Sequence, residues 1–300
     1  MKQLFLLAIL LGFSASTIKA ELRVLTCEPE WKSLVEELAG DKVNASSATT
    51  GKQDPHRIQA RPSLIAKARR ADLLICTGAD LEAGWLPLLI RKSGNADIQP
   101  YAKGYFMATD HVLLMEKPEV LDRSQGDIHA AGNPHVHLDP RRILEIAKAL
   151  AEKLQALDID NSTYYQERYQ DFELRWNKAI EHWQQKAATL KNKNIITYHR
   201  SWIYFQDWLQ LNLISTIEAK PGIPPSSGQL AKLIKQSSAT EVEVIFHAAY
   251  SHAKSAEWLA SKTNIPLVTL PYTVGGLDNV NDLFSMFDTS INLLLEATNK

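Results

Sequence analysis

The longest uninterrupted helical pattern of this 300-residue chain lies in its middle and limits the folds open to it. Large apolar residues recur there every three or four positions: Tyr165, Tyr169, Phe172, Trp176, Ile180, Trp183, Ala187 and Leu190. This spacing predicts one amphipathic helix of about 28 residues, about 40 Å long at 1.5 Å per residue. Because residues 161–191 contain neither Gly nor Pro, we expect a stiff rod whose aromatic stripe is buried as core.

On both sides of this rod, short apolar strands alternate with helical stretches, a pattern typical of parallel α/β sheets. Strands are predicted at 22–26, 42–47 and 72–76 before the rod, and at 195–198, 214–218, 242–246 and 267–270 after it. Asp139 and Pro140 mark a clear helix start, as an N-cap residue followed by a first-turn proline. The chain is therefore expected to form an α/β fold with an N-terminal lobe at 21–160, a linking helix at 161–191 and a C-terminal lobe at 192–300.

The first twenty residues have the features of a secretory signal peptide. Lys2 supplies the positive charge, residues 4–13 form a nearly unbroken apolar run, and cleavage is expected after Ala20. Ten apolar residues are too few to span a bilayer, which needs about 20. No Cys stands at the cleavage point for a lipid anchor. We therefore expect an exported protein that does not itself span the membrane.

The charge balance argues against nucleic acid as a partner. The formal net charge is −1 and charged residues make up 22% of the chain, so there is no basic excess. Hydrophobic residues make up 45%, as in an ordinary globular protein.

The two cysteines, Cys27 and Cys76, each end an apolar strand-like run. If these strands are neighbours in a parallel sheet, a disulfide between them is geometrically feasible, and export would favour it. Two buried free thiols are an equally good interpretation. A zinc–thiolate site is a weaker third.

Three of the nine histidines stand where an extended run meets a turn. His56 and His135 each follow a proline, and His199 directly follows the strand at 195–198. Ligands of open α/β sheets bind outside the carboxyl ends of the strands, and neutral imidazole is the commonest protein ligand for zinc. Because the three form no local motif, the residues alone indicate a candidate metal site, and a structural role for each stays open.

The segments around these histidines resemble the zinc and manganese solute-binding proteins of ABC importers, the cluster A-I zinc-uptake family. Three segments carry the resemblance in order: Asp54-Pro55-His56 with Arg61-Pro62-Ser63, then Asn133 to Pro140, then Tyr198-His199 with Trp202 to Phe205. The resemblance implies two Rossmann-like lobes joined by the rigid helix, with the metal site in the cleft between them. It also implies ligand roles for His56, His135 and His199, with Zn(II) as the transported ion and Mn(II) as the alternative.

One departure from the family pattern concerns the fourth ligand. The family usually places a carboxylate in the loop before the last helix, but residues 270–276 contain none. Asp278 is the tentative replacement, although it suits the N-cap of the final helix equally well. A water molecule could also fill the fourth position, as could Glu28 at the end of the first strand.

Two further histidines lie close to the expected site. His137 stands where the family usually has an aromatic residue; we favour a simple packing role over support of a ligand or weak binding. Some zinc-specific members of the family have a histidine-rich loop that could collect metal. The corresponding residues here, 118–132, contain a single histidine, His129, so a metal-collecting role for this loop is weakly supported. His111, His182, His247 and His252 are expected to be ordinary residues.

Three imidazoles and one oxygen suit Zn(II) better than Mn(II), which prefers more oxygen ligands. We therefore predict a monomeric periplasmic protein that captures Zn(II) and delivers it to an inner-membrane ABC permease. A manganese or iron importer subunit is the close alternative. Two alternatives come from other functional classes. A zinc hydrolase or lyase also holds its metal with three histidines, but no glutamate of this chain stands in a recognisable general-base motif. A surface adhesin fits the plain signal peptide poorly.

Overall fold

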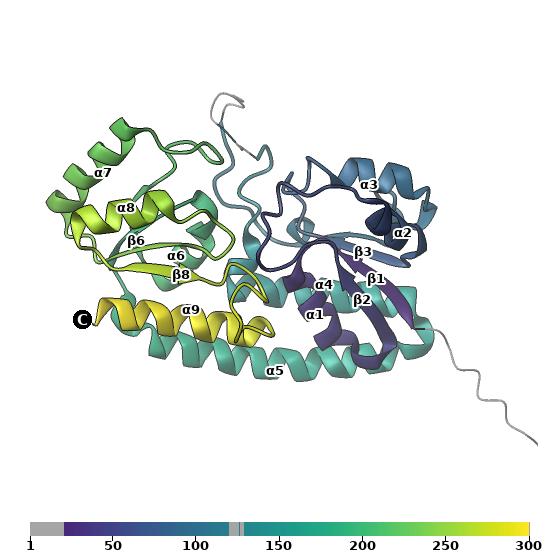
Figure 1. The fold of residues 1–300 in the computed structure, drawn as a ribbon. Coiled ribbons are helices and arrows are strands. Elements are labelled where there is room, and N and C mark those ends of the chain that lie inside the picture. The colour runs from purple at the N-terminus through teal and green to yellow at the C-terminus, as the bar shows by residue number, and fades with distance from the viewer. Residues whose placement is uncertain (1–20, 120–125, 127–128, 300) are drawn as a thin grey trace, which may run out of the picture.

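Two parallel, four-stranded sheets form the framework of the protein (Figure 1). The computed structural model describes residues 21–119, 126 and 129–299, so the expected signal peptide at 1–20 lies outside the described residues. The first sheet has the order β2-β1-β3-β4, with β1 at Leu22–Thr26, β2 at Val43–Ser47, β3 at Leu73–Cys76 and β4 at Tyr105–Met107. The second has the order β6-β5-β7-β8, with β5 at Asn194–Thr197, β6 at Asn212–Thr216, β7 at Val244–Ala248 and β8 at Leu267–Leu270.

The helices cover these sheets. Those that precede the central rod are α1 at Pro29–Ala39, α2 at Pro62–Arg70, α3 at Leu86–Ser93 and α4 at Pro140–Leu157. Those that follow it are α6 at Ile203–Leu209, α7 at Ser227–Thr240, α8 at Lys254–Thr263 and α9 at Leu283–Thr298. None of the helices in the described part of the chain combines the length and the apolarity needed to cross a membrane. The predicted fold class, two α/β lobes with one long helix, is confirmed.

The rod is α5, Ser162–Lys186, which runs beneath both sheets (Figure 1). Its aromatic stripe is buried as predicted, but the α-helix has 25 residues rather than about 28, because the chain tightens into a 3₁₀ turn at Ala188–Leu190. Two tryptophans attach it to α4, which precedes it in the sequence, and to α9, the last helix. The indole of Trp176 donates to the carbonyl of Pro140 at 2.8 Å, and the indole of Trp183 donates to Asp288 at 2.8 Å. The rod is therefore fastened to α4 and to α9.

A disulfide joins Cys27 and Cys76. Strands β1 and β3 are parallel neighbours, which places the two Cα atoms 4.7 Å apart, and both side chains are fully buried. Of the three interpretations left open by the sequence, the bridge is the one that the structure shows, and it removes both free thiols and a zinc–thiolate site.

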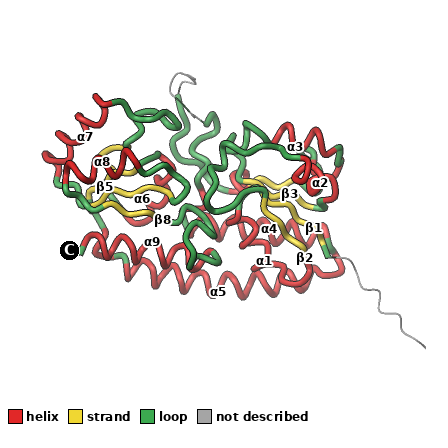
Figure 2. The backbone as a smooth tube through the Cα atoms, viewed as in Figure 1, coloured by secondary structure: helices red, strands yellow, loops and turns green. Residues whose placement is uncertain are grey.

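The candidate metal centre lies on the loops that meet between the two sheets, drawn in green in Figure 2. The carboxyl ends of parallel strands lead into these loops, which is where open α/β sheets hold ligands. His199 follows β5 by two residues, and His56 lies between β2 and α2. His135 directly precedes the 3₁₀ turn at Val136–Leu138 that leads into α4.

Candidate metal centre

The three histidines selected from the sequence converge in space, although 143 positions separate the first from the last. The ring centroids of His56 and His135 are 5.8 Å apart, those of His56 and His199 are 6.2 Å apart, and those of His135 and His199 are 5.9 Å apart. Each pair of rings is close to perpendicular, with interplanar angles of 70° to 77°. Rings at this spacing can turn one nitrogen each toward a shared ion at about 2 Å.

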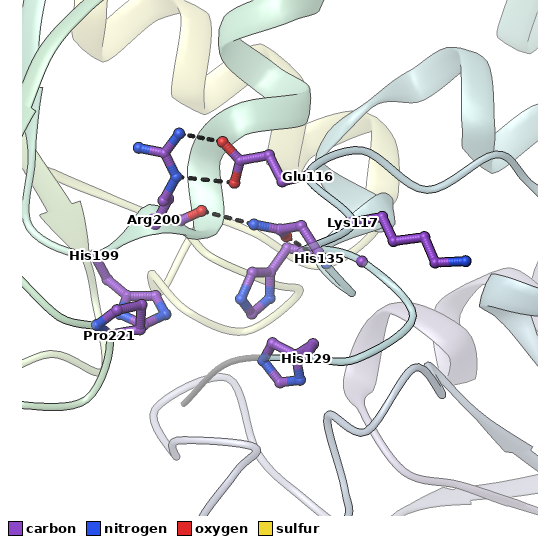
Figure 3. A pocket seen from close by; sticks show the side chains of 9 residues that line it. Glu116, Lys117, His129, His135, His199, Arg200 and Pro221 are labelled. Atoms are coloured by element: carbon purple, nitrogen blue, oxygen red, sulfur yellow. Dashed lines mark hydrogen bonds and ion pairs between the residues drawn. The ribbon is translucent and has the colours of Figure 1, made fainter. Parts of the chain in front are cut away.

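A fourth histidine, His129, belongs to the same cluster. Its ring lies 5.5 Å from that of His56 and 6.2 Å from that of His135. One potential ligand atom from each of these three residues lies within 4.8 Å of the others. Figure 3 shows His129, His135 and His199 around one pocket. The only sequence signal for His129 was its place in the loop that corresponds to the family's metal-collecting segment, and that signal was too weak to select it.

The orientation of the predicted ligands is set by hydrogen bonds to Nδ1. The Nδ1 atom of His56 is 2.8 Å from Oδ1 of Asp54, and that of His199 is 2.7 Å from Oε2 of Glu218. Because Nδ1 is engaged in this way, the ring keeps the Nε2 lone pair for a metal, an arrangement that recurs at metal-binding histidines. The Nε2 atom of His56 is buried and has no hydrogen-bond partner among the described residues, as expected of an atom that awaits an ion.

The electrostatics of the site suit a divalent cation. Burial alone would raise the pKa of Asp54, but hydrogen bonds from the ring and backbone of His56 outweigh it and lower that pKa below its usual value. Burial, followed by the nearby rings of His56 and His199, lowers the pKa of His135 well below its usual range. His135 is therefore neutral at neutral pH. The carboxylates of Asp54 and Glu218 would balance the charge of one M²⁺ ion bound at these imidazoles.

The structure does not place Asp278, the tentative fourth ligand, at the site. Its side chain is 98% exposed and lies 3.1 Å from the ammonium of Lys52, so the structure does not bring it to the histidines. Nor does it cap the last helix, because Asp282 accepts from the Ser285 backbone at 2.7 Å and completes a capping box there. The loop before α9 turns Tyr272 inward and carries Asp278 out to solvent.

Glu28 and His137 face other partners. Glu28 is buried, and its Oε2 accepts from the hydroxyl of Thr77 at 3.0 Å. His135 and His137 do not lie in one extended stretch, because a 3₁₀ turn begins at residue 136. The His137 ring is buried, with Nε2 donating to the backbone oxygen of Tyr272 at 3.0 Å and Nδ1 3.4 Å from Glu30. Both residues are therefore engaged with buried groups of the protein.

Two small cavities reach the histidines. A cavity of about 340 Å³ is bordered by His129, His135 and His199 and by the polar side chains of Lys117 and Asn133 (Figure 3). A second, of about 260 Å³, is lined by residues that include His56, His199 and Glu218. His199 lines both cavities. Spaces of this size admit a hydrated ion and small solutes.

Contacts across the cleft hold the loops of the two lobes together. The guanidinium of Arg200 pairs with Glu116, and its backbone oxygen accepts from the Asn133 amide at 3.0 Å (Figure 3). On the other side of the site, Arg57 donates to the backbone oxygen of Gly222 at 3.3 Å. These contacts join loops of the two lobes on either side of the histidine cluster.

Comparison with known proteins places this site in a family. Residues 24–297 match the family model described as zinc-uptake complex component A, periplasmic. The chain belongs to this ZnuA family. It is accordingly a divalent-metal solute-binding protein of an ABC importer that acts outside the cytoplasm, and not an enzyme. The hydrolase or lyase alternative is thereby removed.

Some relatives are named for manganese, and others for metal without further specification. The manganese ABC transporter substrate-binding lipoprotein PsaA of Streptococcus pneumoniae is 23% identical over 307 residues, which cover 98% of this chain and 94% of the relative. The metal ABC transporter substrate-binding lipoprotein FimA of Streptococcus parasanguinis is 23% identical, with coverages of 87% and 82%.

Solved structures agree on the fold. A zinc-bound ZnuA with residues 138–173 deleted has a TM-score of 0.78 at 22% identity, over 93% of this chain and 98% of that one. The solute-binding protein FpvC of Pseudomonas aeruginosa in complex with Ni²⁺ has a TM-score of 0.77 at 20% identity, with coverages of 93% and 97%. The ZnuA-family fold is therefore shared by proteins seen with different divalent ions.

Proposed function

We propose that this ZnuA-family protein captures Zn(II) through His56, His129, His135 and His199 and delivers it to an ABC permease of the inner membrane. The observation that carries the proposal is a cluster of four imidazoles. His56, His129 and His135 each bring one ligand atom within 4.8 Å of the others, and the His199 ring lies 5.9 Å from that of His135. Asp54 and Glu218 are bound to ring nitrogens of His56 and His199. Four nitrogen ligands suit the tetrahedral preference of Zn(II). Mn(II) prefers oxygen ligands and higher coordination, so the same set disfavours it.

Manganese is the second candidate, because relatives such as PsaA are named for it. Against it stands the ligand set: the carboxylates of Asp54 and Glu218 are held against Nδ1 atoms. Binding of Mn(II) would require at least one of them to leave its histidine. Zn(II) requires no such rearrangement.

The test is a calorimetric titration of the metal-free protein with Zn(II), Mn(II) and Ni(II). Zn(II) is expected to bind one to one and far more tightly than Mn(II). Alanine at each of the four histidines is expected to weaken zinc binding by about two orders of magnitude or more. His182→Ala, on the exposed side of α5, serves as the control and should bind as the wild type does.

Tighter binding of Mn(II) than Zn(II) would favour the manganese alternative. Zinc binding that survives the substitution of His56, His135 and His199 would mean that other residues form the site. If only His129→Ala keeps wild-type affinity, the fourth position belongs to water instead.

Residence in the periplasm is also proposed, on the signal-peptide pattern of residues 1–20. Mass spectrometry of the protein recovered from the periplasmic fraction should find Glu21 as the first residue. Recovery of the full-length chain from the cytoplasm would contradict this.

A further inference from the structure

Tyr272 occupies the region where the sequence led us to expect a carboxylate ligand. It follows β8 by two residues and therefore belongs to the sheet of the second lobe. Its side chain is 1% exposed and reaches across to the loop that carries His135. Its phenol oxygen lies 2.6 Å from Nδ1 of His135, the shortest of the three contacts to a ligand Nδ1 atom described above.

The tyrosine is held from several sides, so its hydroxyl has little freedom to move. Its backbone oxygen accepts from His137, and the hydroxyl of the next residue, Thr273, donates to the buried Glu30. Its ring packs edge-on against Tyr250, with centroids 5.0 Å apart. A group fixed in this way can impose an orientation on its neighbour, because neither hydrogen-bonding partner can relax without breaking other contacts.

We infer that Tyr272 is the positioning residue of His135: its phenol oxygen accepts the Nδ1 proton and thereby leaves Nε2 as the lone pair that binds the metal. The inference rests on the proposed function for the identity of the ligand. A neutral histidine has one proton to place on two nitrogens: it lies on Nδ1 if the phenol oxygen accepts and on Nε2 if the phenol donates to Nδ1. Only the first arrangement leaves the Nε2 lone pair free for a metal.

The arrangement also makes the three histidines unequal. His56 and His199 are each backed by a carboxylate, whereas His135 is backed by a neutral phenol. A carboxylate makes a ligand imidazole a stronger donor than a neutral oxygen does. In addition, Tyr272 follows a strand of the second sheet while His135 precedes α4, which follows the first sheet. Through this bond, the second lobe sets the geometry of a ligand carried by the first.

The first measurement is the tautomer of His135 in the metal-free wild-type protein, by long-range ¹H–¹⁵N NMR of the imidazole. The expected result is a proton on Nδ1. A proton on Nε2 would overturn the inference without any variant and regardless of whether the protein binds zinc.

The second measurement compares zinc affinity in Tyr272→Phe and in Tyr165→Phe. The control, Tyr165→Phe, removes another buried hydroxyl, which donates to Asp158 at 2.8 Å. Tyr165 lies in α5, far from the histidines of the cluster in sequence. Tyr272→Phe is expected to weaken zinc binding by about 10- to 100-fold and to give a mixed His135 tautomer, whereas Tyr165→Phe should change neither.

Failure of the inference and failure of the proposed function look different. If zinc binding is lost in His56→Ala while Tyr272→Phe keeps both wild-type affinity and a single Nδ1–H tautomer, the positioning role is wrong and the metal site stands. If zinc binding survives His56→Ala, the metal site is wrong, and the tautomer measurement still decides the claim about Tyr272.

Discussion

At the scale of single residues, each of three histidines has an oxygen bound to its Nδ1 atom. Asp54 holds His56, Glu218 holds His199, and Tyr272 holds His135. All three are acceptors at Nδ1, but only the carboxylates carry charge. In the proposed site, the charges of these two carboxylates would balance the charge of the bound dication. The site would then need no charge from Asp278, which points into solvent.

Asp54→Asn is expected to weaken zinc binding by about tenfold or more, because the amide keeps the size of the side chain but loses its charge. Competition with a chromophoric chelator would measure the change in Kd. Asp278→Asn is the matched control and should leave the Kd unchanged. Equal losses in the two variants would show that long-range charge, and not the bond to Nδ1, is what matters.

Glu82 is a buried carboxyl away from the histidines, and it makes stability depend on pH. Burial raises its pKa to about 7, although hydrogen bonds with Glu28 and from the backbone of Thr77 and Gly78 oppose the shift. The folded state therefore holds a proton that the unfolded chain releases near pH 4.5. This contribution to stability is complete below pH 4.5 and is lost as pH rises through about 7.

We expect the unfolding midpoint of the metal-free protein to fall between pH 5 and pH 8, and to fall less in Glu82→Gln, whose amide cannot ionise. Thermal or urea unfolding at the two pH values would measure the difference. An identical pH dependence in both proteins would assign it to other groups.

The residues of the proposed site differ in how easily the sequence reveals them. His56, His135 and His199 could be selected because each follows a proline or the end of a strand. His129 and Tyr272 were not selected, because neither stands in a periodic pattern or a local motif. The expected carboxylate at Asp278 rested on the family pattern alone, which this chain does not follow.

At the scale of elements, the bridge between β1 and β3 fastens the first sheet at the end that faces the site. It closes a loop of 49 residues between Cys27 and Cys76, which removes entropy from the unfolded chain. The segments that follow these two strands are also joined to each other, because the hydroxyl of Thr77 donates to Glu28.

Replacement of both cysteines by alanine is expected to lower the free energy of unfolding by about 4 kcal/mol, the chain-entropy value for a loop of this length. Guanidinium unfolding of the variant beside the wild type would measure it. A loss of less than about 1 kcal/mol would mean that the unfolded chain is already compact in this region.

Regular elements were predicted well where the pattern was long. Helix α5 and most of the strands were placed within a few residues, because their apolar periodicity extends over whole elements. Helix α3 and strand β4 were missed: α3 has eight residues with a proline at its start, and β4 has three, which is too short to show alternation.

At the scale of the whole molecule, α5 and the site join the same two lobes at different places. The rod holds α4 and α9 along its length, while Arg200 and Glu116 join the lobes at the cleft. The lobes are therefore expected to unfold together, and metal bound between them should stabilise both.

Zinc at one hundred times its Kd should add about 2.7 kcal/mol to the free energy of unfolding and raise the Tm by about 5 °C. Differential scanning calorimetry of the metal-free and loaded protein would show one transition that moves as a whole. Two transitions, of which zinc shifts only one, would mean that the lobes are thermodynamically independent.

The stiffness of α5 has a consequence for recognition. A binding protein whose lobes move widely changes its overall shape when it is loaded. Because α5 is a 25-residue helix fastened to both α4 and α9, we expect the overall shape of this protein to change little when metal binds. A permease that distinguishes the loaded from the empty protein would then have to recognise local differences at the rim of the cleft. These differences would lie in a few side chains, such as those of His129, His135 and Tyr272. A substitution that misplaced them would make the empty protein resemble the loaded one.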